Sequence, residues 1–511
     1  MSQESSTEIF IGLVAPIGSN LKIVEEKLKE NLEKNGYNTI PIKITDIFDF
    51  SSIKGLPNSL KYYLKMELCT QLRGKLGTGI LAAMAIKKID EKRKKSKKEN
   101  GQKNAYIINQ IKNKGEYDLL SNIYDINYIQ ISCFSNKNNQ DKKLKDKFKD
   151  SNTSTENLDK LKKTKGLIKE DFLKNKFPEE TLEKLIEEYI KEYQEKILPD
   201  ATHKLIEKDR IDPSQEDKNG QQIDDIFHES HYFINLDRND TELNSQVSKF
   251  VDLLFGKYNE YPTQDEFGMS LAHAASVRSN FPGQRQIGSC IISKMGEVIS
   301  VGSIKAPAPH SNPNKIDEDN IADGYHKIKE KIKKWTEEIK KNQELCKFIK
   351  DSIDFHPCTH AELSAILDAA KQGVSIRGAT LYTTTFPCHL CARDIISGGI
   401  SKVVFCEAYP KSKNEELYSN ILEIDPESPS DDKVPFNTFF GVGPKRYHYV
   451  YNLKAKAKED LKENIPPLLK YRSKFHYKNL EKEIISFVDP NSESAEFIAI
   501  FESLLKVKKD T

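Results

Sequence analysis

The stretch EIFIGLVAPIGSNLKIVEEKLKENLEKNGYNTIPIKIT, residues 8–45, constrains the fold of this chain more than any other feature. Its apolar start predicts a strand, a glycine turn follows, and apolar residues at helical spacing from Leu21 to Leu32 predict an amphipathic helix. The alternating segment TIPIKIT predicts a second strand. Strand, helix and strand in this order form a βαβ unit, so we expect a parallel sheet covered by helices.

The same pattern continues through the first half of the chain. We expect strands at 104–111 and 126–134, a helix at 77–92, and a helix followed by a closing strand within 224–237. Residues 136–165 are poor in large apolar side chains, and we expect an exposed insertion or helix pair there rather than part of the core. These segments define a first domain over residues 1–244.

The second half, residues 245–511, again alternates helices and strands. Small-residue and aliphatic patterns predict strands at 287–293, 298–303, 379–386 and 402–409, with helices at 356–373 and 387–399. Residues 312–352 are highly charged and are expected to form an insertion. A second α/β sandwich follows from this order.

Length and composition narrow the class of protein. At 511 residues the chain exceeds what one hydrophobic core usually organises. Charged residues make up 31% and no run approaches the roughly 20 apolar residues of a membrane span. The first residues lack the features of a signal peptide, so we expect a cytoplasmic protein with no membrane partner and reduced cysteines. A net charge of +2 argues against binding to duplex nucleic acid.

Two short motifs bring metal-ligand residue types together. His360, Ala361 and Glu362 precede Pro387-Cys388-His389-Leu390-Cys391, with one helix and one strand expected between them. This is the H-x-E…P-C-x-x-C pattern of zinc deaminases. One imidazole and two thiolates leave the fourth tetrahedral position of zinc open, as a catalytic site requires. We therefore predict that His360, Cys388 and Cys391 bind Zn²⁺.

Glu362 is the predicted catalytic residue. Zinc lowers the pKa of a bound water from about 15.7 to about 7, so that hydroxide is available to attack C4 of a cytosine ring. Glu362 lies two residues beyond the ligand His360, where its carboxylate can take the water proton and pass it to N3 and to the leaving amine. Its removal is expected to leave zinc bound and to abolish the reaction.

Other cysteines and histidines leave two alternatives open. Cys358 precedes His360 by two residues and could complete a closed Cys₃His site of structural type. A second zinc could instead use Cys358 together with His356, His310 or Cys346.

Beyond the metal motifs, residues 245–451 resemble the deoxycytidylate deaminase branch of the cytidine deaminase superfamily. The matching pieces are HAASVRS, GQRQIGSCIIS, GVGPKRY and EAYPKSKNEELY. The last piece is similar to the form found in two-domain bacterial antiviral dCTP deaminases. That resemblance implies an α/β protein with an N-terminal P-loop/kinase-like parallel-sheet domain followed by a deaminase-like three-layer α/β/α domain.

The resemblance also implies a function and substrate contacts. It implies zinc-dependent conversion of free deoxycytidine nucleotides, dCTP or dCMP, to deoxyuridine nucleotides, which would deprive an infecting phage of dCTP. A homo-oligomer and a phage-derived trigger are expected with it. By position, Arg285 and Lys411 would contact the phosphates, with Ser412 and Tyr409 beside them. Ordinary surface charge and packing is the other interpretation of these four residues.

Two departures from the family pattern bear on function. The family's sugar-binding Asn in Gly-x-Asn-x-x-Pro is replaced by Ile304 in the segment GSIKAP. In the N-terminal turn, Gly12 and Gly18 enclose five residues and Ser19 follows, so the lysine of a Walker A loop is missing. Backbone amides of this turn could still bind an anion. Alternative functions are a housekeeping dCMP deaminase, a polynucleotide cytidine deaminase, or a catalytically inactive zinc-binding regulator.

Overall fold

The computed structural model describes residues 8–48, 56–96, 103–149, 179–210, 219–256, 261–279, 285–306, 327–328, 330–335, 358–410, 412–452 and 476–488. The chain divides into two compact units, one formed by Met1–Tyr261 with Phe440–Thr511 and the other by Pro262–Phe439. None of the helices in the described ranges combines the length and the apolar character needed to cross a bilayer.

The first unit contains a six-stranded sheet with the order β12-β5-β4-β1-β3-β2. Five strands run parallel and β12 adds antiparallel to the edge of β5. The strands are β1 (Ile9–Val14), β2 (Tyr37–Lys43), β3 (Lys103–Asn109), β4 (Tyr128–Phe134), β5 (Tyr232–Asn235) and β12 (Gly441–Val442). The parallel sheet predicted from the opening βαβ pattern is thus confirmed.

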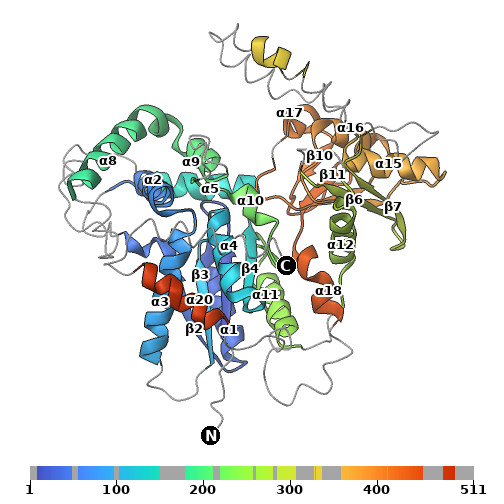
Figure 1. The fold of residues 1–511 in the computed structure, drawn as a ribbon. Coiled ribbons are helices and arrows are strands. Elements are labelled where there is room, and N and C mark those ends of the chain that lie inside the picture. Colours follow the sequence, from blue (N-terminus) through green and yellow to red (C-terminus); the bar gives the residue numbers. More distant parts are fainter. Residues whose placement is uncertain are drawn as a thin grey trace. The chain divides into compact units, whose positions relative to one another are not determined.

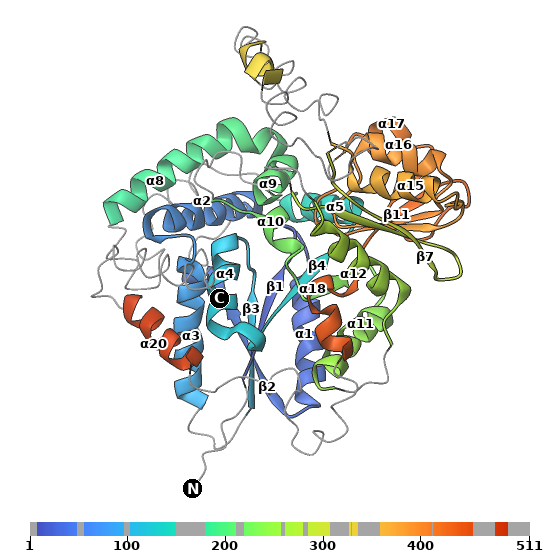
Figure 2. The ribbon, with the colours of Figure 1, turned by 45° about the vertical axis from the view of Figure 1, so that its right-hand side comes forward.

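Helices cover both faces of this sheet, as Figures 1 and 2 show. One face packs against α1 (Leu21–Glu33), α11 (Asp240–Leu254) and α18 (Pro444–Asn452), which share one apolar core with the strands. On the other face lie α3 (Ile80–Ser96), α4 (Lys114–Tyr124) and α20 (His476–Phe487). The remaining helices are α2 (Asn58–Leu76), α5 (Lys137–Phe148), α8 (Glu179–Glu192), α9 (Ala201–Arg210) and α10 (Ile223–Phe227).

Helix α5 corrects one prediction. Residues 136–165 were expected outside the core, yet Gln140, Leu144 and Phe148 of α5 are buried. The Gln140 side-chain amide donates a hydrogen bond of 2.8 Å to the carbonyl of Ile17 in the turn after β1. Three residues spaced by four place one narrow stripe against the fold, which a low average hydrophobicity conceals. Most of the remaining range lies outside the described residues.

The C-terminal segment returns to the first unit. Arg93 of α3 donates to Glu8, with Nε 2.8 Å from Oε1, and to Glu481 of α20, with Nη2 3.0 Å from Oε1. All three side chains are buried, so this ion-pair network fixes α20 to the unit that contains the N-terminal strand. The expected division at residues 244 and 245 falls inside α11, because the apolar face of that helix packs against α1.

The second unit has its own six-stranded sheet, with the order β10-β11-β9-β8-β6-β7. Strands β8, β9, β11 and β10 are parallel, whereas β6 pairs antiparallel with β7 and β8. They are β6 (Gly288–Ile292), β7 (Val298–Ser303), β8 (Thr380–Thr383), β9 (Lys402–Phe405), β10 (Leu422–Ile424) and β11 (Val434–Thr438). Almost all of the expected charged insertion, residues 312–352, lies outside the described residues.

Helices form the outer layers of this unit. Helix α12 (Gln264–Ser276) packs against β6, where a side chain at Gly288 would collide with the α12 backbone. On the opposite face, α15 (Ala361–Lys371) approaches β7 so closely that Gly302 leaves no space for a side chain. Helix α16 (His389–Ser397) shares the apolar core of α15, and α17 (Asn414–Tyr418) follows β9. The unit is therefore a three-layer α/β/α arrangement.

Candidate metal centre

The predicted metal ligands occupy the starts of two neighbouring helices. His360 is the residue before α15, and Cys388 is the residue before α16. Cys391 then falls in the first turn of α16. Because the two helices pack side by side on one face of the sheet, their first turns lie close together. This packing brings together two motifs that lie about thirty residues apart in the sequence.

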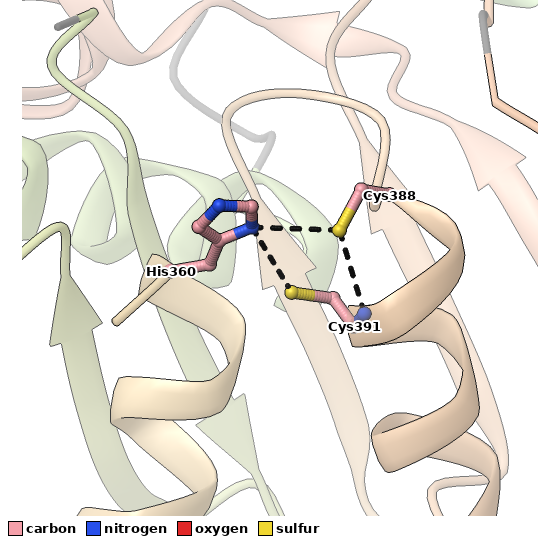
Figure 3. Close-up of side chains that lie close together, drawn as sticks. All are labelled: His360, Cys388 and Cys391. Carbon is pink, nitrogen blue, oxygen red and sulfur yellow. Dashed lines mark hydrogen bonds between the residues drawn. The ribbon is translucent and has the colours of Figure 1, made fainter. Parts of the chain in front are cut away.

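The three side chains point toward one another, as Figure 3 shows. His360 Nδ1 lies 3.4 Å from Cys388 Sγ and 3.5 Å from Cys391 Sγ. One ligand atom from each residue lies within 4.8 Å of the others, and within the described part of the chain no other group of three His, Cys, Asp or Glu side chains meets this condition. The structure thus brings together the residues that the two motifs predicted.

The local electrostatics favour a thiolate at Cys388. Hydrogen bonding from the Cys391 thiol and from His360 lowers the pKa of Cys388. The backbone N–H of Cys391 also donates to Cys388 Sγ at 3.5 Å, so the positive end of α16 acts in the same direction. Thiolate is the form of cysteine that binds metal.

These donors fit zinc. One imidazole nitrogen and two cysteine sulfurs are ligand types that Zn²⁺ prefers, and three protein ligands leave a fourth position for a reactant. Cys358 does not join the group. It packs instead against Ile304 and Ala306, and burial raises the pKa of its thiol to about 11, which favours the protonated form. His310, Cys346 and His356, the alternative ligands of a second zinc, lie outside the described residues.

Glu362 lies in the first turn of α15, beside the ligand group. Its side chain is 3% exposed, and Thr383 Oγ1 of β8 donates to its carboxylate at 3.4 Å. Burial raises the pKa of Glu362 above the ordinary value for a glutamate. A raised pKa makes it easier for this carboxyl group to take up a proton and hold it for transfer.

The structure places the predicted substrate-contact residues that it describes in different environments. Arg285 has an exposed side chain 3.6 Å from Glu407, whereas Tyr409 is buried. Ser412 has a buried hydroxyl that lacks a hydrogen-bond partner among the described residues, and Lys411 lies outside them. Ile304, at the family's asparagine position, is 5% exposed in a small apolar cluster.

Two residues that sequence reasoning missed support the loop before Cys388. Glu407, after β9, accepts hydrogen bonds from the backbone N–H of Phe386 at 2.9 Å and from Thr385 Oγ1 at 3.1 Å. The buried Asn414 donates to the carbonyl of Pro387 at 2.9 Å. Both residues lie in the segment EAYPKSKNEELY, but their supporting roles could not be predicted from it, because those roles depend on elements that meet only after folding.

The N-terminal candidates fall in two different places. Gly12 lies inside β1, where a side chain would collide with the buried ring of Tyr128. Gly18, with φ of 85°, and the buried Ser19 form the turn before α1. Gly12 therefore permits close packing of a strand, and the anion-binding role expected of this segment stays a prediction.

Comparison with known proteins places the metal centre in a family. The model of the cytidine and deoxycytidylate deaminase zinc-binding region matches residues 262–407. A probable deoxycytidylate deaminase of Drosophila melanogaster is 30% identical over 164 residues, which cover 32% of this chain and 68% of that protein. The deoxycytidylate deaminase of Enterobacteria phage T2 is 57% identical over 54 residues, 11% of this chain and 29% of the phage protein.

The chain belongs to the cytidine and deoxycytidylate deaminase family. The family match contains His360, Glu362, Cys388 and Cys391 and begins at the first residue of the second unit. The chain spans less than a third of the length of the phage relatives it matches. A solved structure, the dCMP deaminase of cyanophage S-TIM5 in complex with dCMP and dUMP, matches with 19% identity and a TM-score of 0.23, over 35% of this chain and all of that one.

Proposed function

We propose that this protein is a zinc-dependent deaminase that converts free deoxycytidine nucleotides, dCTP or dCMP, to deoxyuridine nucleotides and so depletes dCTP during phage infection. The observation that carries the reaction is the convergence of His360, Cys388 and Cys391 beside the buried carboxylate of Glu362. The family membership of the second unit supports it.

Each residue has a distinct part in the proposed chemistry. His360, Cys388 and Cys391 hold the metal, and zinc bound there would supply the Lewis acidity that activates water. Water adds its oxygen to C4 of cytosine, the C4–N bond breaks, and ammonia leaves. Glu362 accepts one water proton and transfers it to N3, then takes the proton of the hydroxyl group now on C4 and delivers it to the departing amine, so that both water protons are used. Its burial in unit 2 keeps the carboxyl group available for both directions of proton transfer.

Substrate recognition is proposed to depend on Arg285, Tyr409, Lys411 and Ser412. A guanidinium and an ammonium group match the charge of nucleotide phosphates. The hydroxyl of Ser412 supports this role, since it is buried without a hydrogen-bond partner among the described residues. At the family's sugar-binding position, the buried Ile304 offers no hydrogen bond, so recognition of the sugar is proposed to use other groups.

A housekeeping dCMP deaminase is the second candidate. It is favoured by the names of the Drosophila and phage T2 relatives, each called a deoxycytidylate deaminase. The two functions differ in the phosphate number of the preferred substrate and in the time at which the activity appears.

The first experiment separates substrate classes. The purified protein is incubated with dCMP, dCTP, CMP, CTP and single-stranded DNA, and uracil-containing products are quantified by chromatography. Glu362→Ala is expected to retain one zinc by elemental analysis and to lose activity, whereas Glu416→Ala, an exposed glutamate of α17, keeps both. Activity that survives Glu362→Ala, or that is confined to single-stranded DNA, would overturn the proposal.

A second experiment tests the defensive role in cells. Deoxynucleotide pools are measured in phage-infected bacteria that express the wild type or Glu362→Ala. A fall in dCTP with a rise in deoxyuridine nucleotides, seen only with the wild type and only after infection, supports a phage-derived trigger. Equal change before and after infection favours housekeeping. Light scattering tests the proposed homo-oligomer, which a strictly monomeric protein would exclude.

A further inference from the structure

The first unit contains a cavity of about 370 Å³ that the deaminase reaction does not use. Its walls include the segments that follow β1, β2 and β3, together with α2, which lies beyond the carboxyl ends of these strands in Figure 2. In open parallel sheets, ligands bind in crevices at this edge. The volume is within the range of small-molecule sites.

The charges around the cavity are unequal. Among the lining residues that the structure describes, five are cationic, and Glu116 and Asp209 are acidic. Arg73 binds Glu116 at 2.7 Å and Lys112 binds Asp209 at 2.7 Å, so these two acids are already neutralised inside the protein. The other three cations are Lys43, Lys61 and Lys65, so the described part of the lining has more cationic than acidic side chains.

Helix α2 presents a polar face to this space. Asn58, Lys61, Lys65, Cys69 and Arg73 recur every three or four residues and all line the cavity. A face that only packed against a sheet would be apolar. Burial lowers the pKa of Lys65, and the charges of Lys43 and Lys61 act in the same direction against the opposing charge of Asp46. An anion in the cavity would relieve this repulsion.

The neighbouring turn does not compete for that anion. The backbone N–H of Ile17 donates to the fully buried carboxylate of Asp209 at 2.8 Å. Lys112 binds the same carboxylate and also donates to the carbonyl of Ala15 at 2.7 Å. A protein carboxylate thus already occupies a turn amide that could have held a phosphate, which leaves the lysine-lined cavity as the place for an external anion.

We propose that this cavity binds a nucleotide carrying two or more phosphate groups, with Lys43, Lys61 and Lys65 around the phosphates. The ring of Tyr62 and the side-chain amides of Asn109 and Gln221, which also line the cavity, are suited to stack on a base and to hydrogen-bond with base or sugar. This inference does not depend on the deaminase reaction, because all of its residues belong to the first unit.

The test measures binding to the full chain carrying Glu362→Ala, so that no ligand is turned over. Calorimetric titrations use ADP, inorganic pyrophosphate, adenosine and sulfate. ADP is expected to bind one site, pyrophosphate more weakly, and adenosine and sulfate not measurably. Lys43→Gln and Lys61→Gln are each expected to weaken ADP binding about tenfold, the loss of one charge-assisted contact. Lys34→Gln, an exposed lysine of the first unit, is the matched control and should change nothing.

The unfolding temperature, measured with and without ADP, separates a loss of binding from a folding defect. Because the substitutions relieve repulsion between lysines, the variants should unfold at the same temperature as the parent or a higher one without ligand, and should lose the stabilisation that ADP confers. Failure of ADP and pyrophosphate to bind, binding no tighter than that of sulfate, or equal affinity in Lys61→Gln and Lys34→Gln would each overturn the proposal.

Discussion

The turn before α1 and the start of α16 both present backbone amides, but the chain uses them differently. At α16 the Cys391 N–H meets Cys388 Sγ, a side chain that also faces His360. Before α1 the Ile17 N–H meets Asp209, a carboxylate supplied 192 residues away and neutralised by Lys112. In the first arrangement, which we call open, the ligand atoms of three residues face one another and could hold a metal ion. In the second, which we call closed, the amide and the carboxylate satisfy each other within the protein. A backbone donor of this kind therefore supports a site where it meets a side chain that also faces other ligands, and not where it meets a carboxylate already neutralised within the fold.

The largest expected effect comes from breaking the open arrangement. Cys391→Ser should lose bound zinc and reduce deamination by about 10²-fold or more, since loss of supporting groups around a metal ligand alone costs 10- to 100-fold. Elemental analysis and product chromatography measure the two losses. Cys406→Ser, a buried cysteine outside the ligand group, is the control, and equal zinc content in both variants would contradict the ligand assignment.

Breaking the closed arrangement, the contact of Asp209 with Ile17 and Lys112, should lower the stability of the first unit and leave metal binding unchanged. Asp209→Asn leaves Lys112 as a buried charge without its counter-ion and should lower the free energy of unfolding of the first unit by about 3–5 kcal/mol. Urea unfolding monitored by hydrogen exchange of β1 and α1 measures it. Adding Lys112→Met should recover part of the loss. Zinc content should stay unchanged in both variants, and a loss of zinc would contradict the assignment of this ion pair to the first unit.

A smaller effect is expected at Gly12, whose contact with Tyr128 is again a matter of stability in the first unit and not of metal binding. Gly12→Ala should cost about 1–3 kcal/mol through overpacking against Tyr128. At Gly74 in α2, the described atom nearest to an added Cβ would be Asn219 Nδ2 at 3.5 Å, so Gly74→Ala should be neutral or stabilising by about 0.5–1 kcal/mol. Thermal and urea unfolding compare the two. If Gly12→Ala is tolerated as well as Gly74→Ala, the glycine is not required for packing.

The smallest effect concerns a histidine that is a structural acceptor rather than a metal ligand. His231 Nδ1 accepts the backbone N–H of Gln130 at 2.9 Å, and burial lowers the pKa of His231 well below its ordinary value. The unfolded chain therefore binds a proton at this histidine more readily than the folded protein does. The contribution of His231 to the free energy of unfolding is fully present above about pH 6.5. It decreases as the pH falls below that value, by at most about 1.4 kcal/mol per pH unit. Exchange of β4 amides against pH measures the slope, and His231→Gln should reduce it.

Local patterns in the sequence were sufficient for the metal centre and for most elements. The spacing of His360, Glu362, Cys388 and Cys391 predicted two helix starts and a shared ligand group, and the structure places His360 and Cys388 directly before two neighbouring helices. The residues that support the loop before Cys388 could not be predicted in the same way. Glu407 and Asn414 bind Phe386 and Pro387 through hydrogen bonds that the tertiary fold creates, and the segment that contains both residues does not indicate these partners.

The same limit applied to the first unit. The βαβ pattern predicted β1, α1 and β2, but Asp209 meets the turn only because α9 folds back over it. The burial of α5 was missed because its buried residues are few. The return of Phe440–Thr511 to the first unit depends on Glu481 and β12, and the sequence around them does not indicate where they pack. Long-range pairing, rather than local propensity, decided each of these cases.

The return of the C-terminal segment has a consequence for synthesis on the ribosome. Because chains emerge from the N-terminus, residues 262–439 are complete before Glu481 is available to Arg93. Until then Arg93 has only Glu8 as a buried partner within this network, and the edge of β5 lacks β12. The second unit can therefore fold while the first is still incomplete, and a nascent chain that stops early yields a second unit attached to an incomplete first unit.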